Sequence, residues 1–254
     1  MAGARLIETL EGVVWLLTPV AELVVVASIK RCKLTGSFPV FIGFLLFDVL
    51  RSAVLWWLGQ SPFSNAYRDI WIATEPVFLA LEFLVVLELY RLLYRAYPGI
   101  HSFARGLIAI GIMIAFAVTF GTVKVDLGRI VWTVPDLQRL FLVKRVVCSI
   151  LALLVLTTMA LFPRAPSAKN VLLHGWLLAA LLSTAALGFF AINVGSSTEW
   201  IGTLFLIFQL MCFVGWAFGF QKSQPPPPAP SPEETRKIEE LNAELLAVAR
   251  WLAH

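Results

Sequence analysis

The chain has 254 residues, of which 59% are hydrophobic and only 14% are charged. Soluble globular domains are about 45–50% apolar and about 25% charged, so this composition excludes a soluble globular protein. The net charge of +4 is typical of membrane proteins with Lys and Arg in their cytoplasmic loops. No basic stripe on a soluble module points to nucleic acid as a partner. The composition therefore predicts an all-α protein embedded in a lipid bilayer.

Seven apolar segments follow one another along the chain, and a helix that spans a bilayer needs about 20 such residues. In chain order they are 10–29, 37–58, 70–93, 107–123, 137–162, 171–194 and 200–221. The fourth segment is the clearest transmembrane candidate, because it contains no charged residue. We therefore expect residues 1–222 to form one domain, a polytopic bundle of seven transmembrane helices.

The positions of Lys and Arg in the loops predict the direction of the bundle. Most of them follow the first, third and fifth segments: Lys30, Arg31, Lys33, Arg91, Arg95, Arg105, Arg164 and Lys169. Positively charged loops stay on the cytoplasmic side, so we expect the N-terminus outside and the C-terminus in the cytoplasm. The loop with Lys124 and Arg129 departs from this pattern. The short loops favour a bacterial-type inner (plasma) membrane.

The chain changes character after the seventh segment. Residues 223–232 include the run QPPPPAPSP, which is typical of a stiff polyproline-type linker. Residues 233–254 predict a cytoplasmic amphipathic helix. Its apolar positions repeat with the three- and four-residue spacing of a coiled coil: Ile238, Leu241, Leu245, Val248 and Leu252. We expect these side chains to hold a homo-oligomer together. A helix on the inner leaflet and a helix docked on the bundle are the alternatives.

Ionisable side chains within the predicted spans are the most informative residues. Such groups are costly in hydrocarbon, and they usually face the bundle interior or a wet cavity. Their depths, at 1.5 Å per helical residue, define two layers. The outer layer, which predicts a ligand-binding site, contains Arg51, Glu75, Lys144 and Arg145. The middle layer, which predicts a pathway for ions or protons, contains Glu22, Asp48, Glu82 and Gln209.

Two interpretations of these layers stay open. In the first, the charges pair with one another and fix the packing of the helices, as buried ion pairs can do without a functional role. In the second, they line a polar cavity that opens to the outside and binds a ligand or conducts ions. The number of charged groups favours the cavity.

Several other chemistries are excluded by missing residues. The chain has no HExxH, no GxSxG and no Gly-rich phosphate loop, so no catalytic motif supports an enzyme. The last span has no Lys that could form a retinal Schiff base. The remaining candidates for haem or metal ligands are few and scattered: His101, His174, His254, Cys32, Cys148 and Cys212. We therefore expect neither a cofactor nor a metal.

Two shorter patterns concern the packing of helices. Glu88 and Arg91 lie at the inner end of the third span, where charges are typical of interface anchors. Gly215 and Gly219 form a GxxxG pattern in the seventh span, which permits close contact between helices.

Three hypotheses about function follow. The first is a seven-helix receptor or sensor that binds a small ligand in an outward-facing cavity and signals through the C-terminal helix. The second is an oligomeric cation or proton channel, or an ion-coupled transporter, that uses the mid-membrane carboxylates. The third is a membrane scaffold whose core charges are structural.

Overall fold

The computed structural model describes residues 2–59, 64–93, 134–161, 169–193 and 198–222, together with Glu233, Arg236, Glu240 and Ala243. Within these ranges the chain is helical and contains no strand, which confirms the all-α prediction for this part of the protein. The helices are α1 (Ala2–Arg31), α2 (Pro39–Gly59), α3 (Ser64–Leu93), α5 (Val134–Leu161), α6 (Lys169–Asn193) and α7 (Thr198–Gly219).

Five of these helices are long and apolar enough to cross a membrane. Their apolar sections are Gly12–Arg31, Pro39–Gly59, Asp69–Leu93, Lys169–Ala191 and Gly202–Gly219. They coincide with the first, second, third, sixth and seventh predicted spans, so the chain is an integral membrane protein. The fifth predicted span overlaps α5, whose apolar section, Val146–Thr157, is shorter. The fourth span, 107–123, lies outside the described residues, and a total of seven helices stays a prediction.

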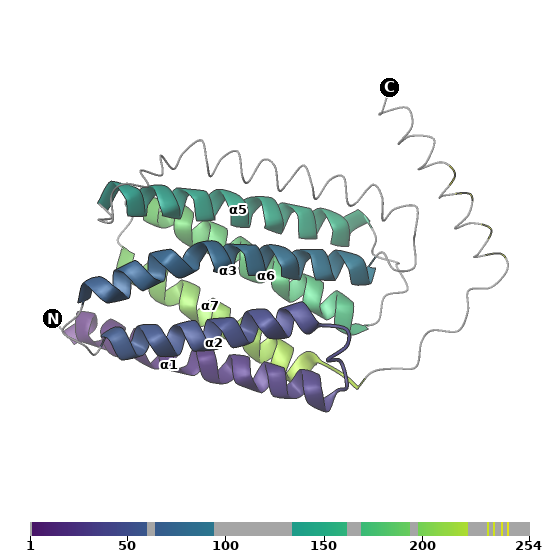
Figure 1. Ribbon diagram of the computed structural model, residues 1–254, viewed down its shortest axis with the longest axis horizontal. Helices are drawn as coiled ribbons and strands as arrows, with labels where there is room; N and C mark the ends of the chain where they lie inside the picture. The colour runs from purple at the N-terminus through teal and green to yellow at the C-terminus, as the bar shows by residue number, and fades with distance from the viewer. Residues whose placement is uncertain are drawn as a thin grey trace, which may run out of the picture.

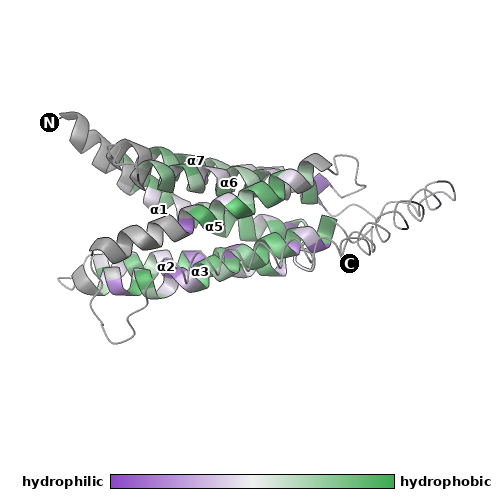
Figure 2. Cartoon of the chain, turned by 90° about the horizontal axis from the view of Figure 1, so that it is seen from above, coloured by the Kyte–Doolittle hydropathy of each residue, from purple (hydrophilic) through white to green (hydrophobic). Residues whose placement is uncertain are grey.

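The described helices pack side by side in two rows. α1, α3, α5 and α7 run in one direction along the long axis of the bundle, and α2 and α6 run in the opposite direction (Figure 1). One row contains α1, α7, α6 and α5 in that spatial order, and the second contains α2 and α3 (Figure 2). The outward faces of both rows are apolar: Phe218 on α7 is 82% exposed and Trp57 on α2 is 69% exposed. Side chains of this kind are suited to contact with lipid.

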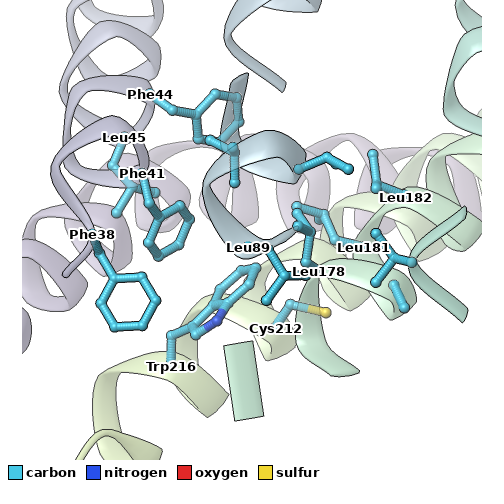
Figure 3. Packing of buried hydrophobic residues seen from close by; sticks show 14 of the residues in the cluster. Phe38, Phe41, Phe44, Leu45, Leu89, Leu178, Leu181, Leu182, Cys212 and Trp216 are labelled. Carbon is cyan, nitrogen blue, oxygen red and sulfur yellow. The ribbon is translucent and has the colours of Figure 1, made fainter. Parts of the chain in front are cut away.

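The half of the bundle that contains the start of α2 and the end of α7 is filled by an apolar core. Phe38 and Phe41 point from α2 and the turn before it toward Trp216 of α7, with Leu178 of α6 on the other side (Figure 3). The fully buried ring of His174 packs among these aromatic rings, and its centroid lies 4.5 Å from that of Phe41. His174 therefore contributes to packing at this level of the bundle.

Side chains from neighbouring helices satisfy the helix ends in this half. The first N–H groups of a helix have no partner within the helix, and negative charge is favourable there. Glu88 of α3 accepts hydrogen bonds from the backbone N–H groups of Val40, at 2.7 Å, and Phe41, at 3.0 Å, in the first turn of α2. The acidic residue expected to be an interface anchor is thus buried and holds the start of another helix.

The C-terminal end of α7 is held from two sides. The Ser28 hydroxyl of α1 donates to the carbonyl oxygen of Ala217 at 2.8 Å. On α6, Asn170 donates from Nδ2 to the carbonyl of Gln221 and accepts from its N–H, at 3.0 and 2.9 Å. These bonds satisfy backbone groups that the end of a helix leaves without partners. The segment that precedes the Pro-rich linker is therefore fastened to both α1 and α6.

The GxxxG pattern is used within the chain, between α7 and α6. A Cβ atom on Gly219 would lie 2.5 Å from Cδ2 of Leu173, and one on Gly215 would lie 3.1 Å from Cδ2 of Leu177. The two glycines therefore allow α7 to approach the leucines of α6 closely, as small residues do in membrane proteins.

Candidate functional site

A cavity of about 180 Å³ lies between the two rows of helices, and all six described helices contribute to its wall. A water molecule takes up about 30 Å³ of liquid, so the cavity has room for several waters or for one small molecule. Its polar lining residues are Thr18, Asp48, Arg51, Ser52, Glu82, Lys144 and Gln209. Its aromatic lining residues are Trp15, Phe44, Tyr67, Trp71, Phe78, Phe189 and Phe205.

Beside the cavity, one carboxylate pairs with two cations. Glu75 of α3 is fully buried, and its Oε2 accepts a 2.6 Å hydrogen bond from Nη2 of Arg51 on α2. Its other oxygen, Oε1, forms a salt bridge with Nζ of Lys144 on α5. Three helices thus meet at a single carboxylate. We refer to Arg51, Glu75 and Lys144 as the Glu75 cluster.

Aromatic rings surround the cations of the Glu75 cluster. Cζ of Arg51 lies 4.9 Å from the ring centroid of Phe78, and Nζ of Lys144 lies 4.8 Å from the same centroid. Trp71 and Phe189 approach Arg51 and Lys144 at 5.7 and 5.2 Å. Contacts at these distances attract a cation to the ring face, and they are stronger where water is excluded. Both cations are therefore fixed by a counter-ion and by aromatic rings.

Three further carboxyl groups have no such cation. Asp48 and Glu82 line the cavity, and neither forms a salt bridge within the part of the chain that the structure describes. Oε2 of Glu82 is buried and accepts no hydrogen bond from a described residue. Glu22 of α1 is almost fully buried, neither of its oxygens meets a hydrogen-bond donor among the described residues, and its carboxyl group interacts electrostatically with that of Asp48.

Acidic groups therefore outnumber basic groups at this level of the bundle, as far as the described residues go. There are two cations, Arg51 and Lys144, and four carboxyl groups, those of Glu22, Asp48, Glu75 and Glu82. An excess of buried carboxylates is unfavourable in a medium of low dielectric constant. It can be balanced by bound protons or by a bound cation, and the cavity provides space for the latter.

The predicted layers meet in this one place. From the outer layer, Arg51, Glu75 and Lys144 come together. Arg145 lies in α5, but its side chain is outside the described residues. From the middle layer, Asp48, Glu82 and Gln209 line the cavity, and Glu22 lies beside Asp48. Arg51, Glu75 and Lys144 thus form ion pairs with one another, whereas Asp48, Glu82 and Gln209 line the cavity. The assignment of these residues to a ligand site and an ion pathway stays a prediction.

The predicted oligomerisation residues, Ile238, Leu241, Leu245, Val248 and Leu252, lie outside the described residues. The four residues described in this segment, Glu233, Arg236, Glu240 and Ala243, are helical and exposed. Nε of Arg236 lies 3.4 Å from Oε1 of Glu240, one helical turn away.

The aromatic part of the cavity wall was not predicted from the sequence, although the spacing of its residues carries a signal. Trp71, Glu75, Phe78 and Glu82 are separated by four, three and four residues, so they share one face of α3. On α1, Trp15 and Thr18 share a face with Glu22 in the same way. Extending each charged position by three or four residues along its helix would therefore have found three of these rings, Phe44, Trp71 and Phe78.

No protein-family model, curated protein sequence or solved structure matches the chain.

Proposed function

We propose that the protein is a membrane receptor or sensor that binds a small ligand in the cavity between the two rows of helices. The observation that carries the proposal is the convergence of polar side chains from five helices on one cavity, where two carboxyl groups lack a cation among the described residues. A purely structural network would be expected to pair its charges and leave no space, since protein interiors are closely packed. The proposed setting is a bacterial-type inner membrane, with the N-terminus outside.

The position of α7 supports a route from the cavity to the C-terminal helix. Phe205 and Gln209 of α7 line the cavity, and the same helix ends at the hydrogen bonds of Ala217 and Gln221 described above. A ligand that changes the packing between the rows would displace α7 together with the start of the linker. Because binding shifts an equilibrium only by its differential affinity for two states, such a ligand must contact both rows.

The proposal is tested by filling the cavity. Ala185 is buried and lines it, whereas its neighbour Ala186 is buried but does not. A ligand at a hundred times its Kd should raise the Tm of the purified protein by roughly 5–10 °C. Ala185→Leu should abolish this rise, and the matched control Ala186→Leu should retain it. If no class of small molecule stabilises the wild type more than Ala185→Leu, the proposal fails.

A second candidate, an ion-coupled transporter or channel, is favoured by Glu22. Neither of its oxygens meets a hydrogen-bond donor among the described residues, and it lies beside Asp48 on the next helix. Together with Glu82 these residues would form a path for cations or protons. Protein reconstituted in liposomes should then conduct ions or protons, and Glu82→Gln should reduce the flux. Glu88→Gln, a change at a buried carboxylate remote from the cavity, is the control. No flux under any gradient would reject this candidate.

A scaffold without a ligand predicts a different outcome for both experiments. Replacing Asp48 by Asn together with Arg51 by Gln would then lower stability and leave the recruitment of a partner unchanged.

A further inference from the structure

We infer that the ligand of this cavity is a small organic cation, an amine or ammonium compound, whose charge is balanced by Asp48 and Glu82. The inference rests on the proposed function and names its ligand class.

The basic groups are already neutralised by the protein itself. Arg51 and Lys144 both bind the Glu75 carboxylate, and both lie against the ring of Phe78. An anionic ligand would have to displace Glu75, which is fully buried and paired with both cations. It would also have to approach Asp48 and Glu82. The geometry is therefore unfavourable for the binding of an anionic ligand.

The acidic groups, in contrast, are available. The Asp48 side chain lines the cavity although the residue is only 9% exposed. It forms no salt bridge with a described residue, and Glu22, its side-chain hydrogen-bond partner, provides no positive charge. Glu82 lines the same cavity, and its buried Oε2 meets no hydrogen-bond donor in the described part of the chain. A buried carboxylate without a partner is costly, and a charged N–H donor is the partner that forms the strongest hydrogen bond with it. A cationic group placed between Asp48 and Glu82 would satisfy both.

The rest of the wall suits the organic part of such a ligand. Trp15, Phe44 and Phe205 bring aromatic rings to the cavity from α1, α2 and α7. Ring faces attract organic cations, including quaternary ammonium groups. The volume of about 180 Å³ is below the roughly 300–1,000 Å³ of sites for drug-sized ligands. The cavity therefore fits a compact cation rather than a large one.

Ser52 offers a way to measure the sign of charge that the cavity accepts. It lines the cavity, and the three native cysteines are buried. The variant Ser52→Cys, purified in detergent, is treated with three methanethiosulfonate reagents. One carries a trimethylammonium group, one carries a sulfonate and one is the neutral methyl compound. Each rate is divided by that for a free thiol in solution, so that the ratio between reagents does not depend on the thiolate fraction of the introduced cysteine. Wild-type protein corrects for the native cysteines.

We expect the ammonium reagent to react faster than the sulfonate reagent by about tenfold or more, because a charged cleft concentrates ions of opposite sign. Adding Asp48→Asn should bring the ratio toward one. Adding Glu88→Gln, a carboxylate at the start of α2 outside the cavity, should leave it unchanged. Choline should slow the neutral reagent, while its uncharged carbon analogue, 3,3-dimethylbutan-1-ol, should not.

The outcomes separate the inference from the proposed function. Equal rates for the two charged reagents, or faster reaction with the sulfonate, overturn the cationic ligand and leave a ligand-binding cavity. Modification by the neutral reagent alone also overturns the inference, since the cavity then admits no charged group. Failure of all three reagents in a folded variant overturns the inference and the accessible cavity together.

Discussion

Nη2 of Arg51 on α2 lies 2.6 Å from Oε2 of Glu75 on α3, and this contact joins the two helices of one row. The other oxygen of Glu75 binds Lys144 on α5, in the opposite row. A single carboxylate therefore connects the helices both within a row and between rows.

Glu75→Gln is expected to be strongly destabilising. The change leaves Arg51 and Lys144 buried without their counter-ion, and breaking a buried ion pair from one side costs about 3–5 kcal/mol. Thermal unfolding in detergent measures the loss. Glu240→Gln is the control, because it removes one partner of an exposed ion pair, and such pairs contribute little. Equal Tm values for the two variants would contradict a structural role for the Glu75 cluster.

Replacement of Glu88 should destabilise the start of α2 in a graded way. Glu88→Gln keeps one carbonyl oxygen as an acceptor for Val40 or Phe41, whereas Glu88→Ala removes both acceptors. Hydrogen bonds to a charged group contribute about 1.5–3 kcal/mol, so stability should fall in the order wild type, Gln, Ala. Amide hydrogen exchange at Val40 and Phe41 provides the local measurement. Unchanged exchange in the Ala variant would show that water replaces the carboxylate without cost.

Gly219→Ala should loosen the contact between α6 and α7. The added Cβ would lie 2.5 Å from Leu173, whereas a Cβ on Gly202, in the same helix, meets nothing within 4 Å. Overpacking of this kind costs about 1–3 kcal/mol. Gly202→Ala should be neutral or stabilising, because Ala is the better helix former by about 1 kcal/mol. Unfolding of the two variants side by side is the measurement, and a reversed order would exclude the close contact.

Asn170→Ala should weaken the end of α7. The backbone N–H and carbonyl of Gln221 each lose a partner, at about 1 kcal/mol per hydrogen bond. Asn170→Asp should rescue only the bond from the Gln221 N–H, because a carboxylate repels the Gln221 carbonyl. Hydrogen exchange at Gln221 should therefore rank wild type slowest and Ala fastest. Identical exchange in Asp and wild-type proteins would indicate that only the N–H bond contributes.

The sequence was sufficient for the class of the protein and for the positions of five of its spans. Both depend on the apolar length of each segment, which is a local property. The expected depth of each charge follows from the helical rise alone. Arg51, Glu75 and Lys144 were grouped on this basis, and they do meet.

The partners within the group were not predictable from the sequence. The pairing of cations with carboxylates depends on which helices are neighbours and on how each helix is rotated about its axis. Neither property can be deduced from the sequence of a single span. Glu88 illustrates the point: its partners are two backbone N–H groups of α2, and its position in the sequence indicates only an end of α3. The cavity is likewise a property of the packed rows, because its wall combines residues from all six described helices.

The fastening of α7 has a mechanical consequence. Ser28, Asn170 and the last turn of α7 are joined by hydrogen bonds, so a force applied to the chain after Lys222 would be shared by three helices. Torque on α7 alone would first have to shear the bonds to α1 and α6. The C-terminal end of α7 is thus coupled to both neighbouring helices, so a displacement of this end would act on all three.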